Sequence, residues 1–202
     1  MEPTPNARTV ESYEDVALSY ARETSGSRVL AGALARLTQA VPGGDVLEIG
    51  SGPGWDADRL EDAGLHVRRT DLTQAFIALQ RGRGKEIDRL DVINDELGGP
   101  YDAVLMLHVL QHVETQDLAP VLGKIAEALR PGGQFLVSVP RGEGSGWEVG
   151  ESGRSYYRAL RTEDEILDAL RGAGLSPVWI DRAPADDGWL AVMAQRPCGG
   201  PS

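Results

Sequence analysis

The chain has 202 residues, of which 41% are hydrophobic and 25% are charged, an ordinary composition for one globular domain. Its single cysteine, Cys198, excludes a disulfide framework and a thiolate metal cluster. Because contacts to phosphates need a basic face, the net charge of −11 argues against a nucleic-acid partner.

The hydrophobic pattern predicts two helices, followed by strands and helices in alternation. Helices are predicted over 11–22, 27–40, 54–64, 73–82, 115–130 and 161–174, and strands over 45–49, 66–70, 86–91, 101–109, 134–140, 176–182 and 188–195. The alternation through residue 140 predicts a parallel sheet with helices on both faces. Residues 183–187 are too few for a parallel crossover, so the last strand is expected to run antiparallel to its neighbour. Residues 141–157 are predicted as a long irregular loop, which is typical of functional or mobile segments.

Both ends of the chain are polar. Residues 1–9 lack the apolar core of a signal peptide, and no apolar run approaches transmembrane length. We therefore expect a cytoplasmic protein with no membrane partner. A single domain is predicted over residues 1–202, with disordered tails at 1–9 and 197–202.

The stretch VLEIGSGPG (46–54) places three glycines within five positions directly after a predicted strand. A dinucleotide fingerprint would have its last glycine where Trp55 stands, and the Gly-Lys-Ser/Thr ending of a P-loop is missing. A tight turn alone would need one or two glycines, so three favour close approach by a flat or bulky ligand. Ligands of open α/β sheets bind beyond the carboxyl ends of the strands, which is where this loop lies.

Two aspartates follow the next two predicted strands. Asp71 comes roughly 20 residues after the glycine loop, where an acid can accept ribose hydroxyls, although turn aspartates are also common. Asp91 lies between Leu90 and Val92, and apolar side chains beside a carboxylate suit an adenine ring and its amine. Together with the glycines, these acids predict an adenosine-shaped slot without a phosphate cradle.

These residues resemble the motifs of class I S-adenosylmethionine-dependent methyltransferases. The resemblance covers about residues 10–195 and rests on five motifs in the family's order: VLEIGSGPG, Asp71, RLDV (89–92), YDAVLMLHVLQHV (101–113) and LRPGGQFLVSVP (129–140). It implies a three-layer, Rossmann-like α/β fold with a seven-stranded, mostly parallel sheet. The implied strand order is 3-2-1-4-5-7-6, with strand 7 antiparallel, in agreement with the antiparallel end predicted above. The implied cofactor is S-adenosyl-L-methionine, with S-adenosyl-L-homocysteine as product, and helices over 10–40 are expected to cover it.

The resemblance also implies cofactor-binding residues. Gly50, Gly52 and Gly54 are expected to line the methionine and ribose, Glu48 to orient the methionine ammonium group, and Asp71 to hold the ribose hydroxyls. Two further residues of these motifs are included in the implied cofactor site: Ser51 and Leu107.

The remaining implied cofactor contacts concern the adenine and the N-terminal helix. Asp91 is expected to meet the adenine amine, with Leu72 and Val92 packing the ring. Tyr13 and Tyr20 resemble tyrosines on a helix that folds over the methionine in small-molecule members, although their spacing equally fits ordinary core packing.

Two histidines follow the fourth strand. His108 lies where the family places residues near the methyl group, and the ordinary pKa of histidine suits a catalytic base, while a pocket-wall role stays open. His112 follows one helical turn later. A zincin would have Glu instead of Val109 directly after His108, and no third ligand is evident, so we expect no metal.

The methyl acceptor is expected between His108, the loop after Pro140 and the N-terminal helix. The residues expected to bind it are aromatic or basic: His112, Arg141, Trp147, Tyr156, Tyr157 and Arg158. The alternative is that the tyrosines pack this loop down and the arginines are solvated.

The sequence therefore predicts a methyltransferase that acts on O, N or C of a small molecule or peptide. A non-catalytic protein that binds the cofactor or a partner on the same fold is the second hypothesis. A nicotinamide-dependent oxidoreductase is the third, and Trp55 argues against it.

Overall fold

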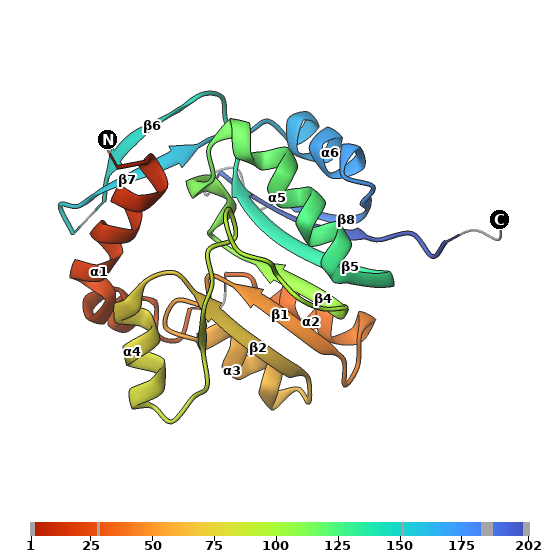
Figure 1. Cartoon of the computed structure of the whole chain (residues 1–202), viewed down its shortest axis with the longest axis horizontal. Coiled ribbons are helices and arrows are strands. Elements are labelled where there is room, and N and C mark those ends of the chain that lie inside the picture. Colours follow the sequence, from red (N-terminus) through yellow and green to blue (C-terminus); the bar gives the residue numbers. More distant parts are fainter. Residues whose placement is uncertain (1–2, 28, 151, 183–187, 200–202) are drawn as a thin grey trace.

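A computed structural model describes residues 3–27, 29–150, 152–182 and 188–199 (Figure 1). The loop predicted at 183–187 and the outer ends of both predicted tails lie outside these residues. The helices are α1 (Pro5–Thr24), α2 (Ala31–Ala40), α3 (Trp55–Asp62), α4 (Gln74–Gly82), the 3-10 helix η1 (Leu110–His112), α5 (Thr115–Ala128) and α6 (Glu163–Gly172). The strands are β1 (Asp45–Ile49), β2 (His66–Asp71), β3 (Asp88–Arg89), β4 (Tyr101–Met106), β5 (Leu129–Pro140), β6 (Ser145–Val149), β7 (Ser155–Ala159), β8 (Ser176–Arg182) and β9 (Trp189–Gln195).

Seven strands form one sheet in the order β3-β2-β1-β4-β5-β9-β8. Neighbours from β3 to β5 are parallel, and β9 runs antiparallel to both β5 and β8. The predicted strand order and the antiparallel last strand are confirmed, because β6 and β7 form a separate hairpin that the predicted numbering does not include.

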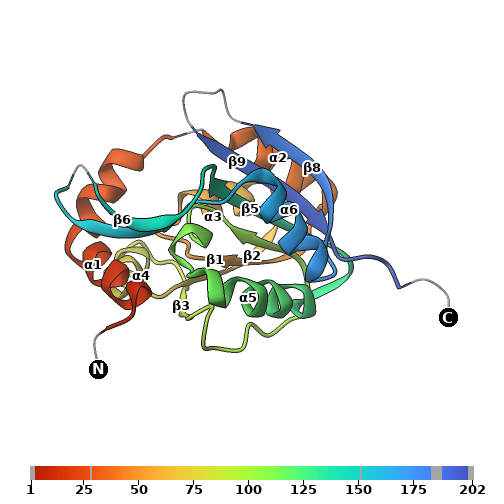
Figure 2. The ribbon, with the colours of Figure 1, turned by 90° about the horizontal axis from the view of Figure 1, so that it is seen from above.

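The alternation of side chains along β1 explains the layers. Successive residues of a strand point to opposite faces of the sheet. Val46 packs in a core cluster with Leu37 of α2, whereas the next residue, Leu47, packs with Leu122 of α5. Figure 2 shows α2 and α5 on opposite sides of the sheet. The predicted three-layer fold is therefore confirmed.

The N-terminal helix begins earlier than predicted, at Pro5. Residues 5–9, expected in a disordered tail, are helical because Thr4 caps the helix: its hydroxyl accepts the N–H of Ala7 at 3.2 Å. Proline at the first helical position fits the same signal, which the prediction overlooked. The second helix begins at Ala31, later than predicted.

Two predicted segments after β4 differ from the structure. The strand predicted over 101–109 ends at Met106, because His108 has a φ of 57°, which does not fit an extended strand. The loop predicted over 141–157 contains β6 and most of β7, an antiparallel hairpin with Trp147 opposite Tyr157. The third strand is reduced to Asp88–Arg89.

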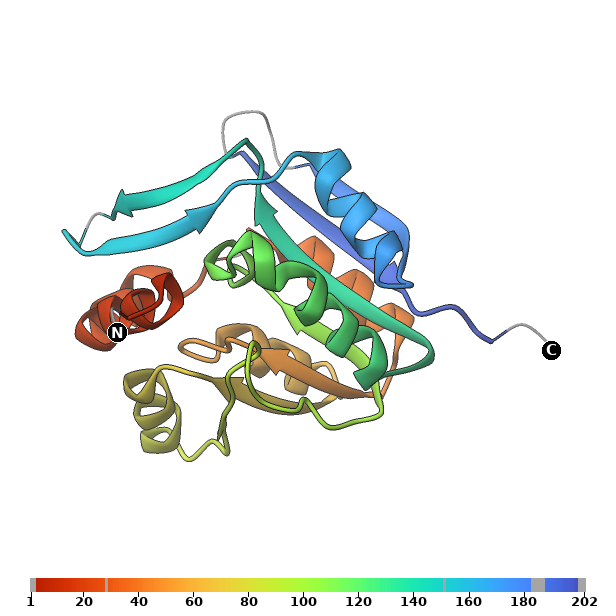
Figure 3. The same ribbon diagram turned by 45° about the horizontal axis from the view of Figure 1, so that its top comes forward.

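Helix α1 lies at the carboxyl ends of the parallel strands. Figure 3 shows it between the β6–β7 hairpin and α4, and it contacts both β7 and α4. In the part of the chain that the structure describes, no helix combines the length and the apolar character needed to cross a bilayer.

Candidate functional site

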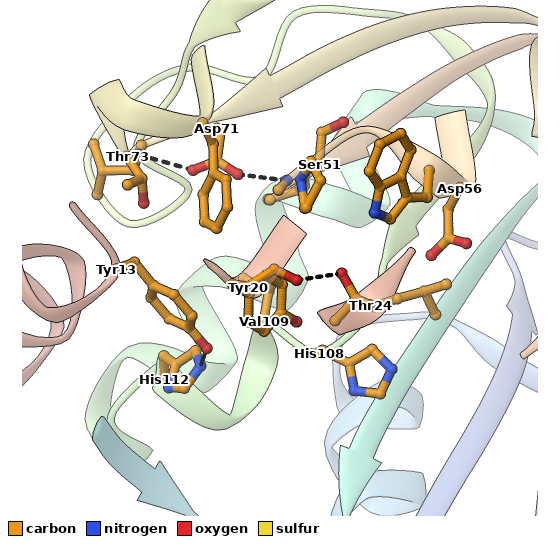
Figure 4. A pocket seen from close by; sticks show the side chains of 18 of the residues that line it. Tyr13, Tyr20, Thr24, Ser51, Asp56, Asp71, Thr73, His108, Val109 and His112 are labelled. Atoms are coloured by element: carbon orange, nitrogen blue, oxygen red, sulfur yellow. Dashed lines mark hydrogen bonds between the residues drawn. The ribbon is translucent and has the colours of Figure 1, made fainter. Parts of the chain in front are cut away.

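A pocket opens where the carboxyl ends of β1, β2 and β4 meet α1 (Figure 4). It brings together most of the residues predicted to bind the cofactor: Tyr13, Tyr20, Gly50, Ser51, Gly52, Asp71, Leu72, Asp91, Val92 and Leu107. The histidines His108 and His112 line it as well. Two predicted cofactor residues, Glu48 and Gly54, lie behind the lining.

The three glycines after β1 have positive φ angles, which glycine adopts without strain. A Cβ atom at Gly50 would lie 2.2 Å from Cγ2 of Val109, and one at Gly54 would lie 2.6 Å from Oε1 of Gln80. At Gly52 a Cβ would meet no described atom within 4 Å. Gly52 therefore presents bare backbone to the pocket. Gly54 is the N-cap of α3 and packs against Gln80, outside the pocket lining, and its contact with the ligand stays a prediction.

Asp71 is held rigidly at the end of β2. Its Oδ2 accepts the N–H of Gly52 at 2.7 Å, and its Oδ1 accepts the N–H of Thr73 at 2.8 Å (Figure 4). Burial raises the pKa of Asp71, and these two N–H groups oppose the shift. Each carboxylate oxygen has a second lone pair, so both oxygens can still accept a hydroxyl from the pocket.

Asp91 closes a tight turn after β3. Its Oδ1 accepts the N–H of Ile93 at 2.9 Å, and its Oδ2 accepts the side-chain amide of Asn94 at 2.8 Å. Leu72 and Val92 line the pocket with it. The structure thus fixes one carboxylate among apolar side chains at this end of the pocket.

Glu48 lies beneath the glycine loop. Only 4% of it is exposed, and its Oε2 has no hydrogen-bond partner in the described part of the chain. Burial raises the pKa of Glu48 to about 8, and a hydrogen bond with the side chain of Ser51 opposes the rise. An unpaired buried acceptor costs free energy, so a donor that reaches this oxygen gains a favourable hydrogen bond.

An aromatic cluster joins α1 to the pocket. The ring of Tyr13 lies 5.9 Å from Phe76, 5.8 Å from Tyr20 and 4.8 Å from Tyr156, measured between ring centroids. Burial raises the pKa of both Tyr13 and Tyr20, so both phenols are neutral near pH 7.

Glu14 connects α1 to the start of α4. Its Oε1 accepts the N–H of Gln74 at 2.6 Å, and its Oε2 accepts the N–H of Ala75 at 2.8 Å. Thr73 is the N-cap residue of α4, but its side chain makes no capping bond. The carboxylate of Glu14, from another helix, therefore caps α4. The partial positive charge at the N-terminus of α4 favours this negatively charged group.

His108 turns the chain sharply at the mouth of the pocket. Its backbone N–H donates to Oγ of Ser138 at 2.9 Å, and its ring lies edge-on to Trp189 with centroids 4.4 Å apart. Burial lowers the pKa of His108 to about 4, and the nearby guanidinium of Arg158 adds to this shift. The imidazole is therefore neutral at pH 7, and its left-handed backbone is of the strained kind found at functional sites.

The ring of His112 lines the pocket and is held by hydrogen bonds at both nitrogens. Its Nδ1 lies 2.7 Å from the carbonyl oxygen of Tyr157, which can only accept, so Nδ1 carries the hydrogen and Nε2 accepts from the hydroxyl of Tyr13 at 3.2 Å. Burial lowers the pKa of His112 to about 4. Both ring nitrogens are engaged within the protein. Among the described residues, no three His, Cys, Asp or Glu side chains are grouped as metal ligands would be.

The other residues predicted to bind the acceptor do not line this pocket. Tyr157 contacts α1 through its backbone N–H, which donates to Oγ1 of Thr9 at 3.0 Å, and Tyr156 packs on Tyr13. The backbone N–H of Arg141 donates to the carbonyl of Gly188 at 2.6 Å. These residues join the hairpin to its surroundings.

Arg158 and Trp147 lie further along the hairpin. Arg158 pairs with Glu148 at 2.5 Å, and its guanidinium lies 5.7 Å from the ring of Trp189, which packs on His108. Trp147 is 39% exposed beneath the guanidinium of Arg8. Of the two, Arg158 approaches the pocket mouth.

Several lining residues were not predicted. Asp56 and Arg59 of α3 form an ion pair at 3.0 Å in the pocket wall, and burial raises the pKa of Asp56. Trp55 entered the prediction only as the residue in place of a glycine. The spacing of Asp56 and Arg59 by one helical turn directly after the glycine loop was a usable signal. Nothing in the sequence marked Thr24 or Phe76.

Comparison with known proteins agrees with this geometry. The family described as a methyltransferase domain matches residues 20–178. A Mycolicibacterium smegmatis protein named "Probable S-adenosylmethionine-dependent methyltransferase" is 29% identical over 76% of this chain and 70% of its own length. A ubiquinone biosynthesis O-methyltransferase of Aromatoleum aromaticum is 31% identical over 62% of this chain, which spans about half of that relative (52%).

The fold is shared with solved structures. The 1,6-didemethyltoxoflavin-N1-methyltransferase of Burkholderia thailandensis, solved with 1,6-didemethyltoxoflavin and S-adenosylhomocysteine, superposes with a TM-score of 0.75. The two chains are 23% identical, and the match covers 98% of this chain and 92% of the other. Fold and pocket define the class I methyltransferase architecture. The chain belongs to the methyltransferase-domain family, and it is a methyltransferase that uses S-adenosyl-L-methionine, as predicted.

Proposed function

We propose that the chain transfers the methyl group of S-adenosyl-L-methionine to an O, N or C atom of a small molecule or peptide. The observation that carries this proposal is the row of open backbone at Gly52 and fixed carboxylates at Asp71 and Asp91 along the strand ends. The names of the relatives, a ubiquinone biosynthesis O-methyltransferase and a toxoflavin-precursor N1-methyltransferase, support a small acceptor. The net charge of −11 favours such an acceptor over a nucleic acid.

The pocket residues suit each part of the cofactor. Gly52 allows close approach of the methionine and ribose, and the free lone pairs of Asp71 can accept the ribose hydroxyls. Asp91 is positioned for the adenine amine. The unpartnered Oε2 of Glu48 fits the methionine ammonium group, directly or through water. Acids outnumber Arg59, the single arginine of the lining, and this balance favours a cationic ligand.

When bound, S-adenosyl-L-methionine supplies an electrophilic methyl group on a sulfonium. The protein supplies orientation and exclusion of water. Residues 1–202 act as one domain in this proposal, with α1 and α2 forming the cover over the cofactor, and Tyr13 and Tyr20 contributing its aromatic surface.

His108 is the proposed base where the acceptor arrives protonated. Its ring is neutral at pH 7, lies in the pocket lining and makes no hydrogen bond to a described residue. The ring of Trp189 packs on His108, and the backbone N–H of His108 donates a hydrogen bond to Ser138, so His108 is held in place. The low pKa leaves the ring unprotonated at pH 7, so it can accept a proton, although it is a weaker base than an ordinary histidine.

Calorimetry with S-adenosyl-L-homocysteine, followed by an acceptor screen with methyl-labelled S-adenosyl-L-methionine, tests the proposal. We expect binding at one site per chain and label transfer to a small molecule or peptide. Absence of binding would overturn the proposed site. Binding without transfer to any acceptor would instead support the second hypothesis, a non-catalytic binding protein.

A further inference from the structure

Two side-chain atoms, one in the pocket wall formed by the start of α3 and one behind the glycine loop, are buried without a hydrogen-bond partner among the described residues. One is Oε2 of Glu48, an acceptor once the carboxyl is ionised, and the other is the donor Nε1–H of Trp55. A buried polar group without a partner is costly, and such groups are rare in folded proteins. A donor in the pocket wall and a carboxyl group behind it point to a ligand that carries both an anion and a cation.

The indole of Trp55 is fixed before any ligand arrives. Trp55 is the first residue of α3, directly after Gly54, whose φ of 87° sets the turn into the helix. The guanidinium of Arg83 lies 4.5 Å from the centroid of the Trp55 ring, and Nη1 of Arg83 donates to the carbonyl of Pro53 at 2.7 Å. The ring edge that carries Nε1 therefore has a set direction. Indole nitrogen is a donor only, so it can pair with an anion or a neutral acceptor but never with a cation.

The surroundings of Trp55 supply the charge that an anion requires. Arg59, one turn along α3, lines the same pocket, and its guanidinium holds Oδ1 of Asp56 at 3.0 Å. The N-terminus of α3 adds partial positive charge. The same wall also contains Asp56, with Glu48 behind it. A phosphate would be repelled by these two acids, whereas an amino-acid zwitterion matches them.

We propose that the indole N–H of Trp55 donates a hydrogen bond to the carboxylate of the methionine portion of the cofactor, with Arg59 as the countercharge. The inference rests on the proposed cofactor site and adds a recognition element that the glycine loop does not provide. Glu48 receives the ammonium group, so the pocket recognises both charged groups of the amino acid.

The test compares two ligands on three proteins by calorimetry. S-adenosyl-L-homocysteine contains the complete amino acid, whereas 5′-methylthioadenosine keeps the adenosine and sulfur and lacks the ammonium and carboxylate. The variant Trp55→Phe removes the N–H and keeps a ring beneath Arg83. The matched control is Trp179→Phe, because Trp179 also lies under an arginine, Arg36, but outside the pocket.

We expect Trp55→Phe to bind S-adenosyl-L-homocysteine roughly tenfold more weakly or worse, as befits a lost hydrogen bond to a charged group, and 5′-methylthioadenosine as wild type does. Trp179→Phe should bind both ligands like wild type. Equal weakening of both ligands by Trp55→Phe, or no weakening of either, would overturn the inference. Failure of the wild type to bind S-adenosyl-L-homocysteine would overturn the proposed site itself, which separates the two failures.

Discussion

The contact between Glu14 and the start of α4 predicts how firmly α1 is held over the pocket. The two carboxylate oxygens of Glu14 accept hydrogen bonds from the N–H groups of Gln74 and Ala75 at 2.6 and 2.8 Å. In Glu14→Gln the side chain keeps one acceptor oxygen but loses the charge. A charge at a helix N-terminus, combined with charge-assisted hydrogen bonds, contributes about 1 to 1.4 kcal/mol. The substitution should therefore raise the open population of α1 roughly five- to tenfold.

Hydrogen–deuterium exchange measures this directly. Amides of α1 should exchange roughly five- to tenfold faster in Glu14→Gln, while those of the core strand β4 change less, and bound S-adenosyl-L-homocysteine should dissociate faster by a similar factor. Glu11→Gln is the matched control, because Glu11 is an exposed residue of the same helix. If the two variants show the same exchange and the same dissociation rate, Glu14 does not hold α1 in place.

Three further predictions concern the pocket. Gly50→Ala should destabilise the fold by about 3 kcal/mol, because its Cβ would overlap Val109, whereas Gly52→Ala should cost about 1 kcal/mol of stability and chiefly weaken S-adenosyl-L-homocysteine binding. Chemical denaturation measures the two losses of stability, and calorimetry measures the loss of affinity. Equal losses of stability in the two variants would contradict the different surroundings assigned to Gly50 and Gly52. His108→Asn, which tolerates the positive φ, should lower kcat about 100-fold or more with unchanged S-adenosyl-L-homocysteine affinity, and a loss below tenfold would make His108 a pocket wall. Burial raises the pKa of Glu48 to about 8, and the nearby charges of Asp56, Arg69 and Asp71 also act on it. An ammonium group beside Glu48 favours the ionised carboxylate, so ligand binding below pH 8 releases protons from Glu48. Affinity for S-adenosyl-L-homocysteine should therefore rise from pH 6 to 8 in the wild type and stay flat in Glu48→Gln; a flat wild-type profile would exclude the assigned role.

The sheet was predictable because its strands carry a strong apolar signal. Residues such as Val46, Leu47 and Val104 are fully buried, and the short link before β9 excluded a parallel crossover. The β6–β7 hairpin escaped prediction for the opposite reason. Every residue of β6 is exposed, so no alternation of apolar and polar residues marks it, and the glycines around it suggested a loop.

Some residues of the site could likewise be predicted from the sequence, and others could not. Residues of local motifs, such as Gly52, Asp71 and Asp91, could be assigned to the pocket from the sequence, because their neighbours in sequence mark the strand ends that line it. Glu14 was missed because its partners lie 60 and 61 residues away, and the contact exists only once α1 docks on α4. Long-range docking of this kind leaves no periodic signal in the sequence.

The structure of the complex with S-adenosyl-L-homocysteine would show directly how the ligand lies along the strand ends of this pocket. We expect the adenine beside Leu72, Asp91 and Val92, the ribose hydroxyls on Asp71, and the sulfur facing His108. The methionine carboxylate should then lie within hydrogen-bond distance of Nε1 of Trp55. An adenine bound at the His108 end of the pocket, or an amino-acid portion directed away from Trp55 and Glu48, would contradict this arrangement.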